Sequence, residues 1–443
     1  MGSATRPRFV RQHKVIDPAS DACLGLRPAT HAYVRAVALL IDEAVVFNGV
    51  DEELVEGWVL VADGRIQEIG TGAAPTADRR IAAGGRFLMP GLIDLHFHAY
   101  SSTFDMHALD HMPKPLLVAH AIRHLTGALS RGFTTVRDPG GGDVGLALAI
   151  AEGLVEGPRF LYGGRALSQT GGHGDMRPGS QEPCSHLYSG VISQVVDGVD
   201  EVRKAARDEL RKGADHIKVF ISGGVASPTD PIWMPQFTDA EIRAAVEEAE
   251  TRRKYVIAHC HTDEGAQRCV RNGVRSIDHA THVTDATARM IAESGTTYTV
   301  PTLAVVHQLL DGKDSLGLFE ESLAKVEGIL PQMLASIEAC RRAGVKIGLG
   351  TDLFGHDYHD RQILELVYRG EVDQPIDVLR SATSINAEIV QRAGELGCIA
   401  PGAQADLILL ESNPLESMSV FERISSDLRV TVKGGRVVKD TLG

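Results

Sequence analysis

Two histidines stand at the end of an apolar run in the first quarter of the chain. The stretch GLIDLHFHA spans residues 91–99 and carries His96 and His98 two positions apart. In a β-strand, side chains two residues apart project from the same face, so the two imidazoles can converge on one point. Neutral imidazole is the commonest metal ligand, although a histidine pair near a strand end can also be hydrogen-bonded and structural. The pair therefore suggests a metal site that further ligands would have to complete.

Four more residues suited to metal binding or acid–base chemistry lie in other apolar runs: Lys218 in DHIKVFISGG, His259 in YVIAHCH, His279 in VRSIDHATH and Asp352 in VKIGLGTD. Lys218 is the most informative, because an unpaired ammonium inside a protein costs several kcal/mol. It must pair with an acid such as Asp138, lose its proton or be modified. A neutral lysine amine can react with carbon dioxide to give a carbamate, whose two oxygens are able to bridge two metal ions.

Short apolar runs alternate with helix-like stretches between residues 89 and 392. One such stretch is TDAEIRAAVEEAETRRK, and the alternation predicts βα units around a parallel sheet. Eight runs qualify as strands: GLIDLHFH, FTTVRDP, PRFLYGG, DHIKVFISGG, YVIAHCH, VRSIDHATH, TTYTVPT and VKIGLGTD. Eight βα units close a (β/α)8 TIM barrel, an α/β fold whose active site lies at the C-terminal strand ends. In that fold the six residues above would meet at one site.

The two ends of the chain have a different pattern. Residues 33–88 contain short alternating runs broken by glycine, and Asp63-Gly64 is a hairpin turn signal. Residues 393–443 repeat this style in ADLILLESNP and LRVTVKGGRVV. We therefore predict one small β-domain formed from both chain ends, beside a barrel at 89–392. Residues 1–32 are predicted to be a loosely ordered N-terminal extension.

Composition limits the kind of partner and the compartment. The 443 residues carry a formal charge of −13, which disfavours nucleic acid and anionic membranes because both select basic surfaces. The six cysteines have no C-x-x-C spacing, as expected for free thiols in a reducing compartment. The polar start lacks a secretory apolar segment, and no apolar run reaches the roughly 18 residues of a membrane span. We expect a cytoplasmic globular enzyme.

The set His96-x-His98, Lys218, His259, His279 and Asp352 resembles, in order and context, the binuclear amidohydrolase superfamily across residues 33–443. The segments SQTGGHGD, IKVFISGGVASPTDP and AHCHTDEGA are similar to the subgroup containing Xaa-Pro and Xaa-Arg dipeptidases and ochratoxin-type amidases. Imidazolonepropionase is a more distant relative. The resemblance implies a TIM barrel, a β-sandwich-like character for the small domain, and a homo-oligomeric metal-dependent hydrolase.

The resemblance also implies a role for each of these six residues. Two metal ions would share them: His96, His98 and Asp352 bind the first, His259 and His279 the second, and carbamylated Lys218 bridges both. Nitrogen and oxygen ligands favour Zn²⁺, with Co²⁺ or Mn²⁺ as alternatives. A metal-bridging hydroxide would attack the amide carbonyl. Asp352 would take the hydroxide proton and deliver it to the leaving amine.

Five further residues are candidates for contacts with the substrate. His173, in the loop GGHGD, is expected to hydrogen-bond the substrate carbonyl or the tetrahedral oxyanion. His261 shares a face with His259, at a position where several dipeptidase relatives carry a substrate-contacting tyrosine. Arg268 is a candidate anchor for a substrate carboxylate, as are Arg137 and Arg177, with an ordinary ion-pair role as the alternative for each.

These inferences predict hydrolysis of a small-molecule amide or peptide. The expected product is a C-terminal amino acid, released from a dipeptide, an N-acyl amino acid or an ochratoxin-like amide. The same centre would also suit a carbamate, a urea or a cyclic amide. Alternatives from other classes are a metal-free binding protein that keeps the barrel and a nicotinamide-dependent oxidoreductase. GGGDVG at 140–145 suggests the latter, but no acid ends the next strand, PRFLYGG, to bind a ribose.

Two more histidine pairs have the i, i+4 spacing of one helix face. They are His107 with His111 in HALDH, and His120 with His124 in HAIRH. Neither contains the glutamate of a zincin motif, so we expect both pairs on solvated helix faces.

Overall fold

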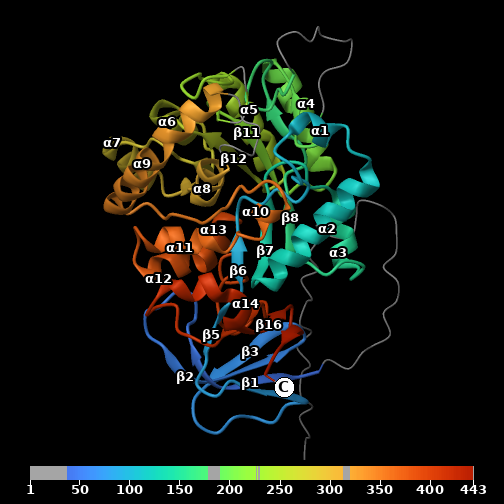
Figure 1. Ribbon diagram of the computed structural model, residues 1–443, viewed down its shortest axis with the longest axis vertical. Coiled ribbons are helices and arrows are strands. Elements are labelled where there is room, and N and C mark those ends of the chain that lie inside the picture. The colour runs from blue at the N-terminus through green and yellow to red at the C-terminus, as the bar shows by residue number, and fades with distance from the viewer. Residues whose placement is uncertain (1–36, 178–189, 226, 228–229, 313–319, 443) are drawn as a thin grey trace, which may run out of the picture. The chain divides into compact units, whose positions relative to one another are not determined.

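Strands from both ends of the chain form one eight-stranded sheet. The computed structural model describes residues 37–177, 190–225, 227, 230–312 and 320–442, so the predicted extension at 1–32 lies outside the described residues. The strand order is β17-β16-β15-β5-β1-β2-β3, with β4 paired to β1, and Figure 1 shows β1–β3 close to the C-terminal β16. The strands are β1 (Leu39–Val46), β2 (Val55–Ala62), β3 (Arg65–Gly70), β4 (Arg79–Ala82), β5 (Phe87–Pro90), β15 (Leu407–Leu410), β16 (Leu428–Lys433) and β17 (Arg436–Asp440).

The turn between β2 and β3 and the pairing of β15 with β5 show how the sequence forms this sheet. Asp63 and Gly64 join β2 to β3 with φ values of 52° and 73°, the left-handed conformation that a two-residue hairpin turn requires. β15 pairs antiparallel with β5, placing Ile408 opposite Met89. Strands from both chain ends thus belong to one sheet.

A second set of strands is entirely parallel and supplies the frame for the polar residues. It consists of β6 (Leu92–Asp94), β7 (Phe133–Asp138), β8 (Arg159–Tyr162), β9 (Ala166–Ser168), β10 (Ser193–Val195), β11 (His216–Phe220), β12 (Tyr255–Cys260), β13 (Ser276–His279) and β14 (Tyr298–Val300). β6, β7 and β8 form one sheet, and the others form a sheet of order β10-β9-β11-β12-β13-β14. Seven of the eight predicted runs contain one of these strands.

Backbone contacts link the two parallel sheets to each other. The N–H of Asp215, just before β11, donates to the carbonyl of Tyr162 in β8 at 2.7 Å. On the other side, Ile347 forms a parallel bridge with Thr299 of β14, and Leu95 donates to the carbonyl of Leu349 at 3.0 Å. The predicted strand VKIGLGTD is thus reduced to an isolated bridge, because only Ile347 pairs with a neighbour in strand geometry.

Helices connect most of the parallel strands and lie mainly on their outer side (Figure 1). In chain order they are α1 (Met106–Asp110), α2 (Lys114–Ser130), α3 (Val144–Ala151), α4 (Gly198–Arg211), α5 (Asp239–Thr251), α6 (Asp263–Arg271), α7 (Asp285–Ser294), α8 (Leu303–Asp311), α9 (Glu320–Ala343), α10 (His356–His359), α11 (Leu364–Gly370), α12 (Pro375–Arg380), α13 (Asn386–Ile389) and α14 (Ile424–Asp427). α5 begins at a capping box in which Thr238 and Glu241 satisfy each other's backbone N–H groups. The glycine-rich segment 140–145 covers most of the connection from β7 to α3 and the first two residues of α3.

No described helix has both the length and the apolar character needed to cross a bilayer. Cys260, Cys269, Cys340 and Cys398 are buried free thiols. Cys23 and Cys184 lie outside the described residues.

Glu365 is a buried acid that connects α11 to the start of α8, and it predicts a pH effect on stability. Its Oε2 accepts the N–H of Ala304 at 2.6 Å, and burial raises its pKa to about 8. Between its ordinary pKa and about 8, the folded state therefore binds more protons than the unfolded state. Stability contributed by Glu365 is lost as pH rises through this window.

We expect Glu365→Gln to remove the loss of folding stability that Glu365 causes as the pH rises. Its melting temperature should match that of the wild type near pH 5 and exceed it by about 2–5 °C near pH 8.5. Thermal unfolding of both proteins across this pH range measures the difference. The control is Glu371→Gln, because Glu371 is an exposed acid that directly follows α11. A constant difference between Glu365→Gln and wild type at all pH values would contradict the prediction.

Candidate active site

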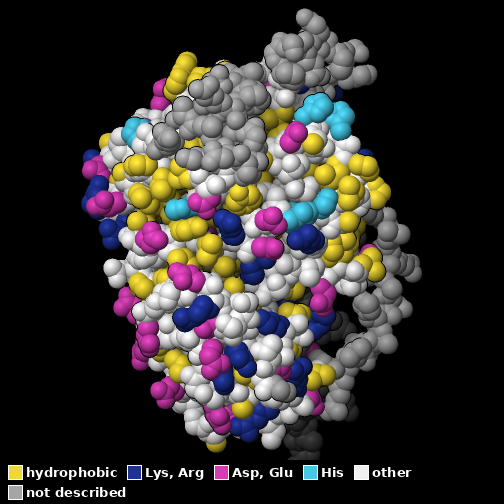
Figure 2. Space-filling view, viewed as in Figure 1, with side chains coloured by type: hydrophobic (Ala, Val, Ile, Leu, Met, Phe, Trp, Pro, Cys, Tyr) yellow, Lys and Arg dark blue, Asp and Glu magenta, His cyan; other side chains and the backbone are white. Residues whose placement is uncertain are grey.

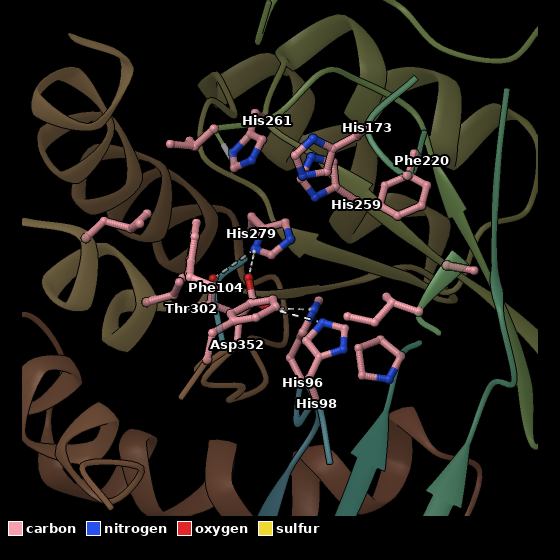
Figure 3. Close-up of a pocket in the computed structure, with 18 of the residues that line it drawn as sticks. His96, His98, Phe104, His173, Phe220, His259, His261, His279, Thr302 and Asp352 are labelled. Atoms are coloured by element: carbon pink, nitrogen blue, oxygen red, sulfur yellow. Dashed lines mark hydrogen bonds and ion pairs between the residues drawn. The ribbon is translucent and has the colours of Figure 1, made fainter. Parts of the chain in front are cut away.

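A cavity of about 110 Å³ collects the polar residues singled out in the sequence. Eight of the eleven candidate site residues line it: His96, His98, His173, Lys218, His259, His261, His279 and Asp352. Figure 3 labels all of these except Lys218 and shows the labelled side chains around one space, with His96 and His98 on one side and His173, His259 and His261 on the other. Residues more than 250 positions apart in the chain thus meet at one place. The predicted convergence of these side chains is what the structure describes.

Asp352 lies at the centre of the contacts between these side chains. Its Oδ1 lies 3.4 Å from His96 Nε2 and 3.3 Å from His98 Nε2, and its Oδ2 lies 3.9 Å from His279 Nδ1. The backbone of Asp352 has a φ of 58°, and its N–H donates to the carbonyl of His96 at 2.7 Å. This unusual conformation for a non-glycine residue brings the carboxylate against the histidines.

Neighbouring backbone and hydroxyl groups orient the imidazoles. His98 Nδ1 lies 3.1 Å from the carbonyl oxygen of Gly140, to which it donates a hydrogen bond, and His98 Nε2 faces Asp352. His279 Nδ1 lies 2.8 Å from the hydroxyl of Thr302. Partners of this kind fix ring orientation in metal sites. His259 is less constrained: its Nε2 lies 3.3 Å from the carbonyl of Gly223, and its ring is 4.6 Å from that of His279.

Asp278 is a buried acid that sequence analysis missed. Its Oδ2 lies 2.9 Å from His96 Nδ1 and 3.4 Å from Lys218 Nζ, and its Oδ1 lies 3.0 Å from Arg137. Arg137 is fully buried, so its ion-pair role is the one the structure supports. Lys218 therefore has Asp278 as its acidic neighbour, where the sequence had suggested Asp138. A carboxylate inside the apolar run VRSIDHATH was the available signal.

Asp94 is a second missed acid, and it ties β6 to the segment that carries Asp352. It is completely buried and accepts hydrogen bonds from the His96 N–H at 2.9 Å, the Thr351 hydroxyl at 2.6 Å and Gln362 at 2.8 Å. Because Thr351 precedes Asp352, these bonds hold the backbone positions of His96 and Asp352 relative to each other.

The burial of the site shifts its protonation equilibria. Burial lowers the pKa of His96 to about 4, with a further contribution from Lys218. Burial also lowers the pKa of Lys218, although Asp278 partly opposes the shift. Burial by itself would raise the pKa of Asp352, but His96 and His98 outweigh it and lower the pKa overall. His96 as a neutral imidazole and Asp352 as a carboxylate are the forms that bind metal ions.

His173 is held by a group of polar residues behind it. Its Nδ1 lies 2.8 Å from the Ser227 hydroxyl and 3.3 Å from the Asp230 carboxylate, and Ser227 itself donates to Asp230. The ring stacks on His259 with centroids 4.3 Å apart. A Cβ at Gly224 would lie only 2.1 Å from the ring, so only glycine leaves room for His173 in this position. Nε2 remains as the ring nitrogen for a substrate.

His261 and Arg268 have different surroundings. His261 lines the cavity, and its Nδ1 lies 2.7 Å from the Thr281 hydroxyl. Arg268 does not line the cavity: it bonds Asp239 at 2.7 Å and the carbonyl of Phe237 at 2.5 Å. The structure therefore does not bring Arg268 to the other candidates. Arg177 likewise pairs with Asp175 at 2.6 Å.

The rest of the cavity is apolar. Its side chains come mainly from α8, α9 and the segments around α1 and Asp352. They include Phe104, Met106, Phe220, Val225, Val305, Val306, Leu309, Val326, Ile329, Met333 and Phe354. Among the described lining residues, Lys218 is the one lysine or arginine. The cavity therefore combines a polar end of imidazoles and carboxylate with an apolar end.

The i, i+4 histidine pairs lie elsewhere, with one unexpected position. His107 on α1 and His111, which directly follows α1, are exposed, as expected, and their rings stack with centroids 4.3 Å apart. His120 is partly buried, but His124 is only 2 % exposed. The expectation that His124 faces solvent is wrong, because α10 packs over this part of α2.

The donor set at the polar end fits divalent metal ions. Ligand atoms of His96, His279 and Asp352 all lie within 4.8 Å of one another, and His98 reaches the same oxygen of Asp352. These are buried nitrogen and oxygen donors, and Nδ1 of His98 and of His279 lie at hydrogen-bond distance from the Gly140 carbonyl and the Thr302 hydroxyl. Nitrogen and oxygen donors with oriented rings are expected around zinc and related cations.

Comparison with known proteins gives related chains over most of the sequence. Residues 87–438 match the model of the amidohydrolase family. The chain is 33% identical over 369 residues to ochratoxinase of Aspergillus niger, covering 80% of this chain and 75% of that protein. A crystal structure of a prolidase complexed with N-methylphosphonate-L-proline has 41% identity and a TM-score of 0.87, with 91% of this chain and all of that chain covered. Imidazolonepropionase of Streptomyces griseus is more distant, at 23% identity over 86% of this chain and 93% of that protein.

Proposed function

The chain belongs to the amidohydrolase family, and we propose that it hydrolyses an amide bond whose nitrogen belongs to an amino acid. As a member of this family it is a hydrolase acting on carbon–nitrogen bonds. The observation that carries the proposal is the meeting of six imidazoles, Lys218 and Asp352 at the polar end of one largely apolar cavity. The named activities of the ochratoxinase and prolidase relatives support an amide of this kind.

We assign two divalent metal ions to the polar end, Zn²⁺ first and Co²⁺ or Mn²⁺ as alternatives. His96, His98 and Asp352 would hold one ion, His259 and His279 the other, and Lys218, as a carbamate, both. When bound, the ions would supply Lewis acidity at the scissile carbonyl and acidify water. The close grouping of the His96, His279 and Asp352 ligand atoms supports metal binding at this end of the cavity.

The protein's own side chains would then move and bind the reacting groups. Asp352 would accept a proton from the attacking water and return it to the amide nitrogen as the carbon–nitrogen bond breaks. His173, through Nε2, would donate a hydrogen bond to the carbonyl oxygen as it becomes negatively charged. The apolar end would exclude water and bind an apolar part of the substrate.

We further interpret the parallel strands and the 347–349 segment as the predicted (β/α)8 barrel at 89–392. The hydrogen bonds between Asp215 and Tyr162 and between Leu95 and Leu349 support closure, because they join the two parallel sheets. The small β-domain would consist of residues 33–88 and 393–443, with an N-terminal extension at 1–32. A homo-oligomer is expected from the family resemblance.

The substrate class can be tested with a panel of zinc-loaded reactions. Dipeptides and N-acyl amino acids that vary the C-terminal residue and the acyl group would be incubated with the protein, and free amino acid would be quantified. We expect cleavage, with kcat/KM at least tenfold higher for apolar acyl groups than for charged ones of equal size, because the cavity end is apolar. Cleavage of carbamates, ureas or cyclic amides alone would overturn the proposal.

Asp230 predicts a positioning effect on His173. Asp230→Asn keeps the size of the side chain but removes the charge beside His173 Nδ1. We expect kcat to fall about tenfold with metal content unchanged, because Nε2 is aimed less well at the substrate oxygen. Steady-state kinetics with metal analysis measures both quantities. The control is Asp239→Asn, which changes an exposed acid paired with Arg268 outside the cavity. Equal kcat for Asp230→Asn and wild type would exclude this role.

A further inference from the structure

Four histidines from two helices face one another outside the cavity. α2 contributes His120 and His124, and α10 contributes His356 and His359; we call them the α2–α10 histidine cluster. Ring centroids are 4.0 Å apart for His124 and His359, 4.5 Å for His120 and His356, and 4.6 Å for His124 and His356. Figure 2 shows histidine side chains gathered on the visible face where α2 and α10 lie in Figure 1. None of the four lines the catalytic cavity.

The orientation of His124 is the one that metal-binding histidines adopt. Its Nδ1 lies 2.8 Å from the carbonyl oxygen of Ala99, so Nδ1 carries the hydrogen and donates it. The Nε2 lone pair is then directed at His356, whose Nδ1 lies 2.6 Å away. A ring that donates to a backbone carbonyl through one nitrogen presents the other nitrogen, unprotonated, as a ligand.

We propose that the α2–α10 histidine cluster binds a transition-metal ion, Zn²⁺ or a cation of similar ligand preference, at a site separate from the catalytic centre. His124 Nε2 and His356 Nδ1 are the first two ligands, and His120 is the third. His120 and His356 are only partly buried, so their rings can turn. Two imidazole nitrogens on a tetrahedral zinc ion are roughly 3.3 Å apart. The rings of His124 and His356 would therefore separate by under about 1 Å.

The surroundings of the cluster favour neutral imidazoles, and the positive and negative side chains near it offset each other. Burial lowers the pKa of His124 to about 4, and burial together with Arg123 lowers the pKa of His356. Neutral imidazole is the form that binds metal. The charged groups that act on His356 are Arg123, Asp357 and Asp360. The positive charge of Arg123 is thus offset by acids on α10 and beyond its end.

A metal ion here would connect α2 to the segment that follows Asp352. α10 begins four residues after Asp352, and the N–H of Gly355 donates to the carbonyl of Ser101 at 2.9 Å. The ion would add a further link to the hydrogen bond between Gly355 and Ser101 and to the ion pair between Asp360 and Arg131, the residue that follows α2. A bound ion would therefore stabilise the packing of these segments. Metal binding at this site does not depend on the proposed amide hydrolysis.

The experiment counts bound metal with Zn²⁺ as the probe. Full-length protein stripped of metal would be dialysed against Zn²⁺, and bound zinc per chain measured by elemental analysis for the wild type and for His120→Ala/His356→Ala. We expect the double variant to bind one equivalent fewer. The matched control is His107→Ala/His111→Ala, an exposed i, i+4 pair on α1, which should bind as much zinc as wild type. Equal zinc in wild type and His120→Ala/His356→Ala, or a loss in the control instead, would overturn the proposal.

A second measurement covers the case in which the double variant fails to fold. Crystals of the wild-type protein soaked in Zn²⁺ would be measured at the zinc absorption edge. We expect an anomalous peak between α2 and α10, about 2.0–2.1 Å from His124 Nε2. Absence of that peak, with zinc present at the catalytic centre, would overturn the proposal independently of any variant.

Discussion

Replacing Lys218 with alanine is expected to lower kcat/KM by about 10³-fold or more and to remove at least one bound metal ion per chain. Lys218 is buried at the polar end of the cavity, with Nζ 3.4 Å from Asp278. We propose that it links the two metal ions as a carbamate, so alanine leaves the pair without a bridge. The fold should survive, because Asp278 keeps its ion pair with Arg137 at 3.0 Å. Metal analysis and steady-state kinetics measure the two effects.

The matched control for Lys218→Ala is Lys254→Ala. Lys254 pairs with Asp215 at 2.9 Å, just before β12 and away from the cavity, so its loss should leave metal content and activity unchanged. Added acetate offers a further test, because a small carboxylate can replace the two carbamate oxygens in the space left by the lysine side chain. We expect partial recovery of activity with acetate. Full activity of Lys218→Ala without any addition would contradict the assignment.

The second large effect is expected for Asp352→Asn, with kcat lower by about 10³-fold. The amide keeps the size of the side chain but cannot accept and return a proton. At least one metal ion should remain bound, because His96 and His98 still contribute their Nε2 atoms and His279 is not changed. KM should change little, since the apolar end of the cavity is intact. Kinetics with metal analysis therefore separates proton transfer from metal binding.

Asp360→Asn is the control for Asp352→Asn. Asp360 follows α10 in the same segment, pairs with Arg131 at 3.2 Å and does not line the cavity. It should retain the activity of the wild type. A kcat for Asp352→Asn within threefold of the wild type would show that another group transfers the proton.

Much of the frame could be predicted from periodicity, because the parallel strands are short apolar runs between amphipathic helices. β7, β11 and β12 lie within their predicted runs. GLIDLHFH was predicted as one strand, but β6 ends at Asp94, and His96 and His98 follow it in irregular backbone. β9 and β10 have three residues each, too few for a periodic signal.

The sequence predicted those site residues whose type alone indicates metal binding. It missed the residues whose role depends on a partner that is distant in the sequence. Histidines and a lysine in apolar runs indicated ligands from sequence alone. Asp278 accepts a hydrogen bond from Arg137, which is 141 positions away in the chain. Asp94 accepts a hydrogen bond from the hydroxyl of Thr351, which is 257 positions away. No local pattern contains such pairings. Arg268 was a candidate because of its charge, but its guanidinium bonds Asp239 and the carbonyl of Phe237.

The most direct test of the central claim is a metal titration of amidase activity. Protein stripped with a chelator would receive Zn²⁺ in steps, and release of free amino acid from the best substrate of the panel would be measured at each step. We expect no activity without metal and a plateau once the catalytic centre holds two equivalents. Full activity in the stripped protein, or a plateau at one equivalent, would contradict a two-metal amide hydrolase.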